Sequence, residues 1–140
     1  MAPAVEVAVA GRSPLPARAA VAVVLRVLAR EHRVGFVSLT FVGRDRMRAL
    51  HRRYKGRSQV TDVLAFVLNG PGGRRVGDVY VCPWVAVREA RRRRIPIREE
   101  LVRLVVHGTL HVLGYEHPDD ESRTGSPMWR RQERYVAALR

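Results

Sequence analysis

Apolar residues alternate with other residues in two segments near the N-terminus, residues 5–9 and 36–42. A period of two places one set of side chains on a single face, which predicts two strands. Residues 63–68 form a nearly continuous apolar run, as expected for a strand covered on both faces. The Gly- and Pro-rich segment 69–73 is typical of a turn, so residues 76–82 are predicted to return as the hairpin partner.

Apolar residues recur at helical spacing in five further segments. These predicted helices span about residues 14–31, 44–54, 84–94, 97–113 and 121–139. Ser13 followed by Pro14 is typical of a helix start, and Leu25 belongs to the apolar side predicted for the first helix. In the second helix Tyr54 is predicted to face inward, together with Met47 and Leu50.

The fourth predicted helix differs from the others because it is apolar almost all round from Leu104 onward. The exceptions are two histidines, Gly108 and Thr109. Such a helix is expected at the centre of a fold, and Gly114 is expected to end it as a C-terminal cap. The pattern predicts an α+β fold in which a small mixed four-stranded sheet packs against about five helices, all within a single domain over residues 1–140.

The chain is strongly basic, with 26 Lys and Arg against 13 Asp and Glu and a formal net charge of +13. A field of this sign favours polyanions such as nucleic acid, ribosomes or an anionic membrane surface. Lys55 is the only lysine, which indicates a compositional bias toward arginine. That bias explains arginine in place of lysine, but it does not explain a twofold excess of basic residues, so contact with nucleic acid is expected.

Cys82 is the only cysteine, which excludes an internal disulfide and a Cys-rich zinc module. The N-terminal region lacks the layout of a secretory signal, because Glu6 and the Pro-rich residues 13–16 fall where an apolar core would be. The apolar stretch 17–29 carries two arginines and is shorter than the roughly 20 residues that span a bilayer. A cytoplasmic protein without a membrane partner is therefore expected.

Candidate metal ligands lie in and after the buried helix. His107 and His111 are four residues apart and therefore share one helix face. Burying two imidazoles costs free energy unless their nitrogens find partners, and a metal ion provides one for both. A chain reversal at Gly114 would bring in His117 as a third ligand. Three imidazoles suit Zn²⁺ and leave one coordination position open, as in catalytic zinc sites, although other divalent ions remain alternatives.

Residues 107–117 read HGTLHVLGYEH, which resembles the signature H-G-x-L-H-x-x-G-Y-D-H of the YbeY family. Further similar segments are Tyr54-Lys55-Gly56, the run 61–66 (TDVLAF), Gly77-Asp78-Val79, and Met128 with Gln132-Glu133. Matches are correctly spaced over residues 54–133, more than half of the chain. The chain departs from the family pattern at three positions, where Lys55, Ala65 and Glu116 replace arginine, serine and aspartate.

The resemblance implies a single-strand-specific, metal-dependent endoribonuclease that acts in 16S rRNA 3′-end maturation, ribosome biogenesis and quality control. The implied partners are ribosomal RNA and the small ribosomal subunit, with a small-subunit ribosomal protein or an assembly GTPase as further partners. The family arginine at position 55 is thought to serve RNA handling or catalysis. Lys55 keeps the charge but lacks the planar fork that binds phosphate through two hydrogen bonds.

Residues outside the histidines are candidates for the remaining roles. Lys55 and Glu116 are candidate catalytic residues, the first for neutralising the phosphate and the second for orienting a histidine or relaying a proton. The candidate RNA-binding residues are Arg44, Arg48, Arg52, Arg53, Lys55 and Arg57. Residues 91–94 are four arginines that fit both a solvated helix end and a phosphate-contacting patch. Trp84 and Trp129 fit both stacking on bases and burial in the core, and the core is the more frequent place for an aromatic residue on an amphipathic helix.

Two alternative functions are left open by the sequence. The histidine spacing also occurs in metzincin-like zinc proteases, but these place a glutamate after the first histidine, where this chain has Gly108. The second alternative is a non-catalytic ribosome assembly factor with a structural metal. Structural zinc sites usually have four protein ligands, so this alternative requires a fourth, such as Glu116 or a distant residue.

Overall fold

The computed structural model describes residues 5–32, 35–56, 60–69 and 74–139. Four strands form one sheet in the spatial order β1-β2-β4-β3. Their bounds are Val5–Ala10 for β1, Gly35–Phe41 for β2, Val63–Asn69 for β3 and Arg75–Val81 for β4. β1 and β4 both run parallel to β2, whereas β3 and β4 are antiparallel. The sheet is therefore mixed, as the sequence predicted.

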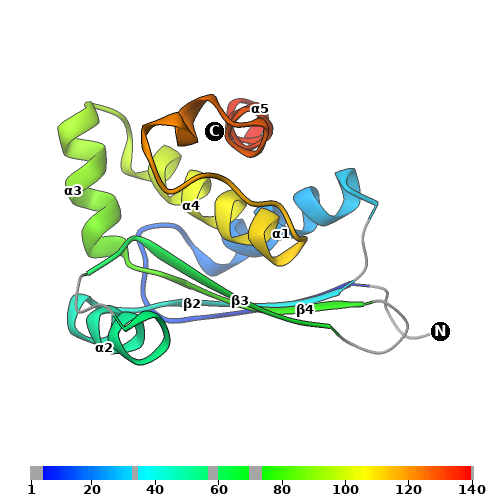
Figure 1. Cartoon of the computed structure of the whole chain (residues 1–140), viewed down its shortest axis with the longest axis horizontal. Coiled ribbons are helices and arrows are strands. Elements are labelled where there is room, and N and C mark those ends of the chain that lie inside the picture. Colours follow the sequence, from blue (N-terminus) through cyan, green and yellow to red (C-terminus); the bar gives the residue numbers. More distant parts are fainter. Residues whose placement is uncertain (1–4, 33–34, 57–59, 70–73, 140) are drawn as a thin grey trace.

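Five α-helices and one short 3₁₀ helix complete the described chain. The α-helices are α1 (Ala17–Arg30), α2 (Arg44–Lys55), α3 (Pro83–Arg93), α4 (Ile97–Val112) and α5 (Pro127–Leu139). The 3₁₀ helix η2 (Glu121–Gly125) precedes α5. Figure 1 shows α1, α4 and α5 on one side of the sheet and α2 on the other. The α+β class and its central helix are confirmed.

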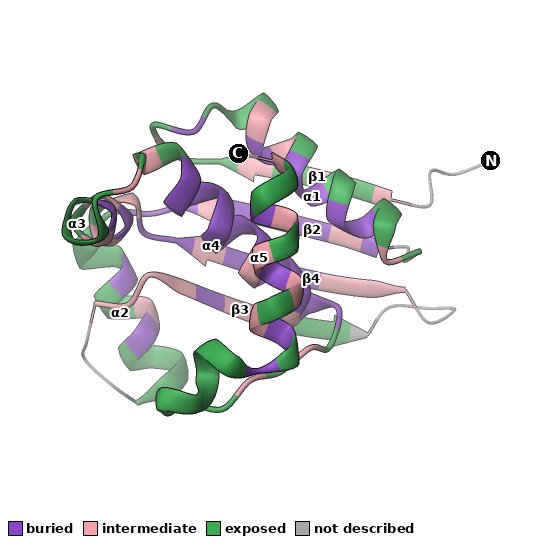
Figure 2. Cartoon of the chain, turned by 90° about the horizontal axis from the view of Figure 1, so that it is seen from above, coloured by how far each residue is buried: buried purple, intermediate pink, exposed green. Residues whose placement is uncertain are grey.

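The core lies between the sheet and α4, which is enclosed by elements from both ends of the chain (Figure 2). Leu101, Val105 and Leu110 of this helix have no exposed surface. Glycines allow the helix to approach the sheet closely. A Cβ atom at Gly108 would overlap the Val79 side chain of β4, so this glycine is required by packing.

Several predicted details were wrong, and each error has a tertiary cause. α1 begins at Ala17 after Pro16, while the Ser13 hydroxyl accepts a hydrogen bond from the Leu15 N–H instead of capping the helix. Leu25 is 42% exposed because the helix turns Val23, Val24 and Val27 toward the sheet. The last predicted helix is two helices, η2 and α5.

The hairpin also differs from its predicted environment. β3 is covered on both faces only near its start, and Leu68 near its end is 68% exposed. Tyr54 is 52% exposed rather than facing inward. The turn predicted at residues 69–73 lies largely outside the described residues. In the part of the chain that the structure describes, none of the helices combines the length and the hydropathy needed to cross a bilayer.

Candidate metal centre

The chain reversal at the end of α4 positions the third histidine. Gly114 has φ +98°, a conformation that glycine adopts without strain. Its N–H donates to the His111 carbonyl, and the Tyr115 N–H donates to the Leu110 carbonyl. These two bonds form a Schellman motif, which satisfies carbonyls at the helix end and turns the chain back. The following residues then bring His117 to the face of α4 that carries the other two histidines.

The three histidines lie together as the sequence predicted. Their ligand nitrogens fall within 4.8 Å of one another, and the Nε2 atoms of His107 and His117 are 3.2 Å apart. Ring centroids are separated by 4.6–5.0 Å. Among the described residues, these three histidines are the one group of three or more His, Cys, Asp or Glu side chains whose geometry fits a metal ion. Glu116 does not belong to this group, so its carboxylate does not supply the fourth ligand that a structural metal site would require.

The other ring nitrogen of each histidine, Nδ1, lies within hydrogen-bond distance of a carbonyl oxygen. Nδ1 of His107 lies 2.6 Å from Oε1 of Gln132, and Nδ1 of His111 lies 2.9 Å from the Tyr115 carbonyl oxygen. Nδ1 of His117 lies 2.8 Å from the Pro118 carbonyl oxygen. Because these oxygens only accept hydrogen bonds, each Nδ1 carries the proton and each Nε2 presents a lone pair. Three converging lone pairs repel one another, and this donor set fits a divalent cation.

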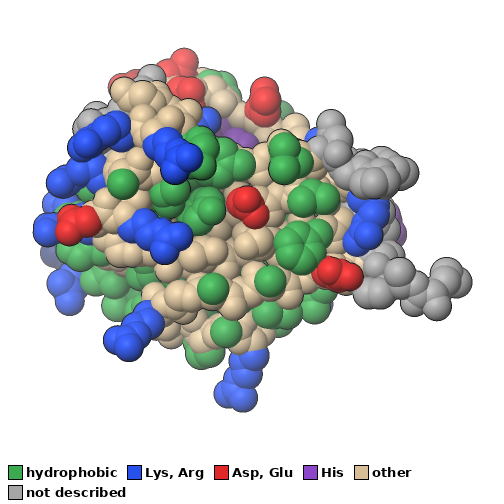
Figure 3. Space-filling model, turned by 90° about the horizontal axis from the view of Figure 1, so that it is seen from below, with side chains coloured by type: hydrophobic (Ala, Val, Ile, Leu, Met, Phe, Trp, Pro, Cys, Tyr) green, Lys and Arg blue, Asp and Glu red, His purple; other side chains and the backbone are tan. Residues whose placement is uncertain are grey.

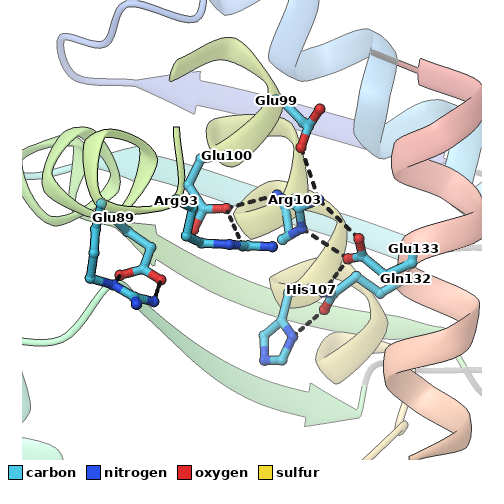
Figure 4. A network of polar contacts seen from close by, with 9 residues as sticks. Glu89, Arg93, Glu99, Glu100, Arg103, His107, Gln132 and Glu133 are labelled. Atoms are coloured by element: carbon cyan, nitrogen blue, oxygen red, sulfur yellow. Dashed lines mark hydrogen bonds and ion pairs between the residues drawn. The ribbon is translucent and has the colours of Figure 1, made fainter. Parts of the chain in front are cut away.

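Gln132 is held by a network that extends away from the metal centre. Its side chain is 1% exposed, and its Nε2 donates to Oε2 of Glu133 at 3.0 Å. Arg103 donates to both oxygens of Glu133 at 2.9 Å. These bonds orient the amide so that its oxygen faces His107, as Figure 4 shows. The sequence matched Gln132 to the family pattern but did not predict its role as a partner of His107. That role depends on the packing of α5 against α4.

Arg103 itself is almost fully buried and is surrounded by carboxylates. It donates to Glu100 at 2.9 Å and to Glu99 at 3.2 Å, in addition to Glu133. The hydrogen bonds that Arg103 donates to Glu133 raise the pKa of the Arg103 guanidinium further, although burial opposes this. Burial raises the pKa of the Glu100 carboxyl, while Arg103 and Arg93 act to lower it. A buried cation with several hydrogen-bonded partners fixes the geometry around it.

Burial also changes the ionisation of the metal-site histidines. Burial, followed by the charge of His111, lowers the pKa of His107 to about 4. Burial and the charge of His117 lower the pKa of His111. Both imidazoles are therefore neutral at pH 7, which is the form that binds metal.

The charges of the two candidate catalytic residues act on the same histidine. After burial, His117 and the hydrogen bond to Tyr115, the charge of Glu116 raises the pKa of His111 and the charge of Lys55 lowers it. Lys55 and Glu116 are both exposed. Lys55 is the last residue of α2, and Glu116 lies in the loop after α4.

The predicted RNA-binding arginines of α2 are exposed, and Figure 3 shows basic side chains gathered at that end of the molecule. These residues are Arg44, Arg48, Arg52 and Arg53. Arg57 lies outside the described residues. Trp84 is 39% exposed, with the guanidinium groups of Arg44 and Arg88 at 5.1 Å and 4.7 Å from its ring centroid, so it is not a core residue.

The remaining histidines do not join the metal centre. His32 is exposed. His51 is only 8% exposed, and neither histidine belongs to the metal-binding group. The position that carries the catalytic glutamate in metzincins is Gly108, which faces Val79 of the sheet. A glutamate there would be directed into the core rather than toward a substrate.

Comparisons with known proteins agree with this geometry. The profile of the family described as Endoribonuclease YbeY matches residues 15–140. A protein named Endoribonuclease YbeY from Chromohalobacter salexigens is 40% identical over 87 residues, 60% of this chain and 56% of that protein. One of the same name from Thermotoga sp. strain RQ2 is 34% identical over 100 residues, 71% of this chain and 65% of that protein.

A solution structure from Thermotoga maritima has a similar fold, with a TM-score of 0.67 and 25% sequence identity. That similarity covers 95% of this chain and 88% of the other. The sequence alignments are shorter, and this chain spans about half the length of the curated relatives that it matches first. Because the family profile extends over nine-tenths of the residues, including the three histidines, the chain belongs to the Endoribonuclease YbeY family.

Proposed function

We propose that this protein is a metal-dependent endoribonuclease that cleaves single-stranded RNA and acts in 16S rRNA 3′-end maturation, ribosome biogenesis and quality control. The observation that carries this proposal is the convergence of three Nε2 atoms whose Nδ1 partners are all fixed by oxygens. Membership of the YbeY family supports the reaction class. The basic surface supports a polyanionic substrate, since the formal net charge is +13.

The proposed resident ion is Zn²⁺, one per chain, because three imidazoles suit zinc. Bound by three neutral ligands, such an ion supplies Lewis-acid chemistry and favours the deprotonation of water near neutral pH. The chain's own residues perform the remaining tasks. His107, His111 and His117 hold the ion, and Gln132 fixes the proton of His107 on Nδ1.

The exposed cations near the site bind and position the RNA. Lys55 neutralises the scissile phosphate as a point charge, since its charge reaches His111. The α2 arginines, with Arg57, contact phosphates along the strand. Glu116, whose charge acts on His111, orients that histidine or relays a proton. In this assignment Lys55 and Glu116 are the catalytic residues beside the metal ligands.

The cellular context is proposed from the family and the charge. We infer a cytoplasmic protein of one domain over residues 1–140, whose partners are ribosomal RNA and the small ribosomal subunit. A small-subunit ribosomal protein or an assembly GTPase would bring it to the precursor.

The two alternatives lack a supporting observation. A protease of the metzincin type has no room for its glutamate at Gly108. A structural metal site usually has four protein ligands, and the described residues provide three.

The test is cleavage of a ribosomal RNA precursor that spans the small-subunit 3′ end. Wild-type protein, His111→Ala and the control His32→Asn are purified identically and assayed with and without a chelator. Cleavage by the wild type and by His32→Asn, lost in His111→Ala and on chelation, is expected. Equal cleavage by all three, or none by any, would contradict the proposal, and metal-dependent folding without cleavage would favour the assembly factor.

A further inference from the structure

A cavity adjoins the metal centre on the side of α3 and α5. It has a volume of about 350 Å³, within the range of small-molecule sites. His107 and Gln132 contribute to its wall, so the cavity borders the metal centre. The other walls come from the start of β3, from α3, from η2 and from α5.

One side of the cavity offers an aromatic surface. Trp129 of α5 is partly buried and lines the cavity, together with Val63, Val85 and Leu104. An indole ring beside aliphatic side chains is a surface on which a nucleobase stacks, and such stacking is a main source of affinity in single-strand sites. Burial in the core alone therefore does not describe the environment of Trp129.

One cation at the cavity remains available for a ligand. Arg92 and Arg93 are paired with Glu89 and Glu100. By contrast, among the described residues no carboxylate lies within ion-pair distance of Arg123, whose guanidinium lies 5.9 Å from the Trp129 ring centroid. A guanidinium beside an aromatic ring can turn to a phosphate while a base occupies the ring.

The cavity is also lined by carboxylates, which bear on the kind of ligand that it can bind. Asp62, Glu89 and Glu100 all line the cavity, and Figure 4 shows the last two with their arginine partners. Glu89 and Glu100 are each paired with an arginine, so their oxygens act mainly as hydrogen-bond acceptors. A nucleotide suits this lining better than inorganic phosphate does, because the exocyclic amino group of its base donates hydrogen bonds to carboxylate oxygens while its phosphate pairs with an arginine. Burial raises the pKa of the Asp62 carboxyl.

We propose that this cavity binds one unpaired nucleotide of the RNA, with its base on the Trp129 ring and its phosphate at Arg123. This inference rests on the proposed function for the identity of the ligand. A base can enter only when it is unpaired and unstacked from its neighbours. The cavity would therefore select single-stranded RNA beside the metal centre, and it would position the neighbouring phosphodiester bond at the histidines.

The binding test uses the fluorescence of Trp129. The chain has two tryptophans, so Trp84→Phe leaves Trp129 as the only reporter. The metal-loaded protein is titrated with adenosine 5′-monophosphate and, separately, with inorganic phosphate. Quenching by the nucleotide at concentrations where phosphate has no effect is expected. Equal quenching by both would overturn the inference, because it would indicate a site for anions alone.

Variants test the two contacts separately. Trp129→Ala is expected to weaken nucleotide binding about 10- to 100-fold, and Trp129→Phe to restore most of it, because a phenyl ring retains stacking. Nucleotide binding by the variants is followed by calorimetry. Arg123→Gln is expected to weaken binding more than Arg134→Gln, which removes the same charge from α5 at a different cavity. Zn²⁺ affinity should be unchanged in all of them. Wild-type binding by Trp129→Ala would overturn the inference.

Cleavage assays separate this inference from the proposed function. If the wild type cleaves single-stranded RNA and Trp129→Ala does so equally well, the base site is wrong and the nuclease assignment stands. If nucleotide binding depends on Trp129 but the wild type cleaves no RNA, the base site stands and the nuclease assignment is wrong. Discrimination against duplex RNA by the wild type that decreases in Trp129→Ala would support both.

Discussion

Replacing Gln132 by methionine tests the arrangement of the metal centre most directly. Methionine has a similar volume and no oxygen, so it removes the acceptor that lies 2.6 Å from Nδ1 of His107. Gln132 is 1% exposed, which prevents water from replacing the lost bond easily. A buried donor left without a partner costs about 1–3 kcal/mol. Without the acceptor the imidazole can also adopt the other tautomer, in which Nε2 no longer presents a lone pair to a metal.

The expected effect on metal binding follows from that change. Loss of a partner to a ligating histidine typically weakens metal affinity about 10- to 100-fold, which is about 1.4–2.7 kcal/mol. Because a bound metal stabilises only the folded state, the increase in Tm produced by saturating Zn²⁺ should shrink by about 4–10 °C. Zn²⁺ affinity is measured by competition with a chromophoric chelator, and Tm by circular dichroism with and without the ion.

Tyr135→Phe is the matched control on the same helix. It removes the hydroxyl that donates to Glu31, a partly buried hydrogen bond that does not involve His107. This variant should lose stability with and without Zn²⁺ while keeping wild-type Zn²⁺ affinity. If Gln132→Met binds Zn²⁺ as tightly as Tyr135→Phe does, the contact to Gln132 does not orient His107 and the reasoning is refuted.

Three further predictions concern packing, pH and charge. Gly108→Ala should lower the free energy of unfolding by about 1–3 kcal/mol in urea titrations, because the new methyl group overlaps the Val79 side chain. The control Gly125→Ala should be nearly neutral, because there is open space around Gly125. Equal effects of the two substitutions would contradict the close packing at Gly108. In the metal-free protein the pKa of His107 is about 4, against 6.5 in the unfolded chain, so the unfolded state binds more protons between these two pH values. The free energy of unfolding should therefore rise by about 3 kcal/mol from pH 4 to 6.5 and then level off. A flat profile over this window would refute the lowered pKa of His107. Lys55→Ala should reduce RNA cleavage without changing Zn²⁺ affinity, and Lys55→Arg should retain cleavage because it keeps the positive charge. Similar losses of cleavage in both variants would show that the reaction does not depend on the charge at this position.

The sequence by itself determined the features that depend on local spacing. Histidines four residues apart share a helix face whatever surrounds the helix, and Gly114 takes the positive φ that reverses the chain. The three-histidine centre could therefore be predicted before any fold was known. The strands and helices were also predictable, because their periodicities of two and 3.6 residues persist over whole elements.

Other features were decided by contacts between distant parts of the chain. Gln132 lies 25 residues from His107, and Arg103 lies 30 residues from Glu133, so neither partner follows from a local pattern. Exposure was also misjudged where packing decides it: Leu68 looks like a core residue in sequence, but only the start of β3 is covered by α4. Local geometry determined which groups could bind a metal, and nearby backbone carbonyls hold His111 and His117. The packing of α5 against α4 decided how His107 is protonated and held, because a hydrogen bond across two helices forms only when the tertiary fold brings both partners together.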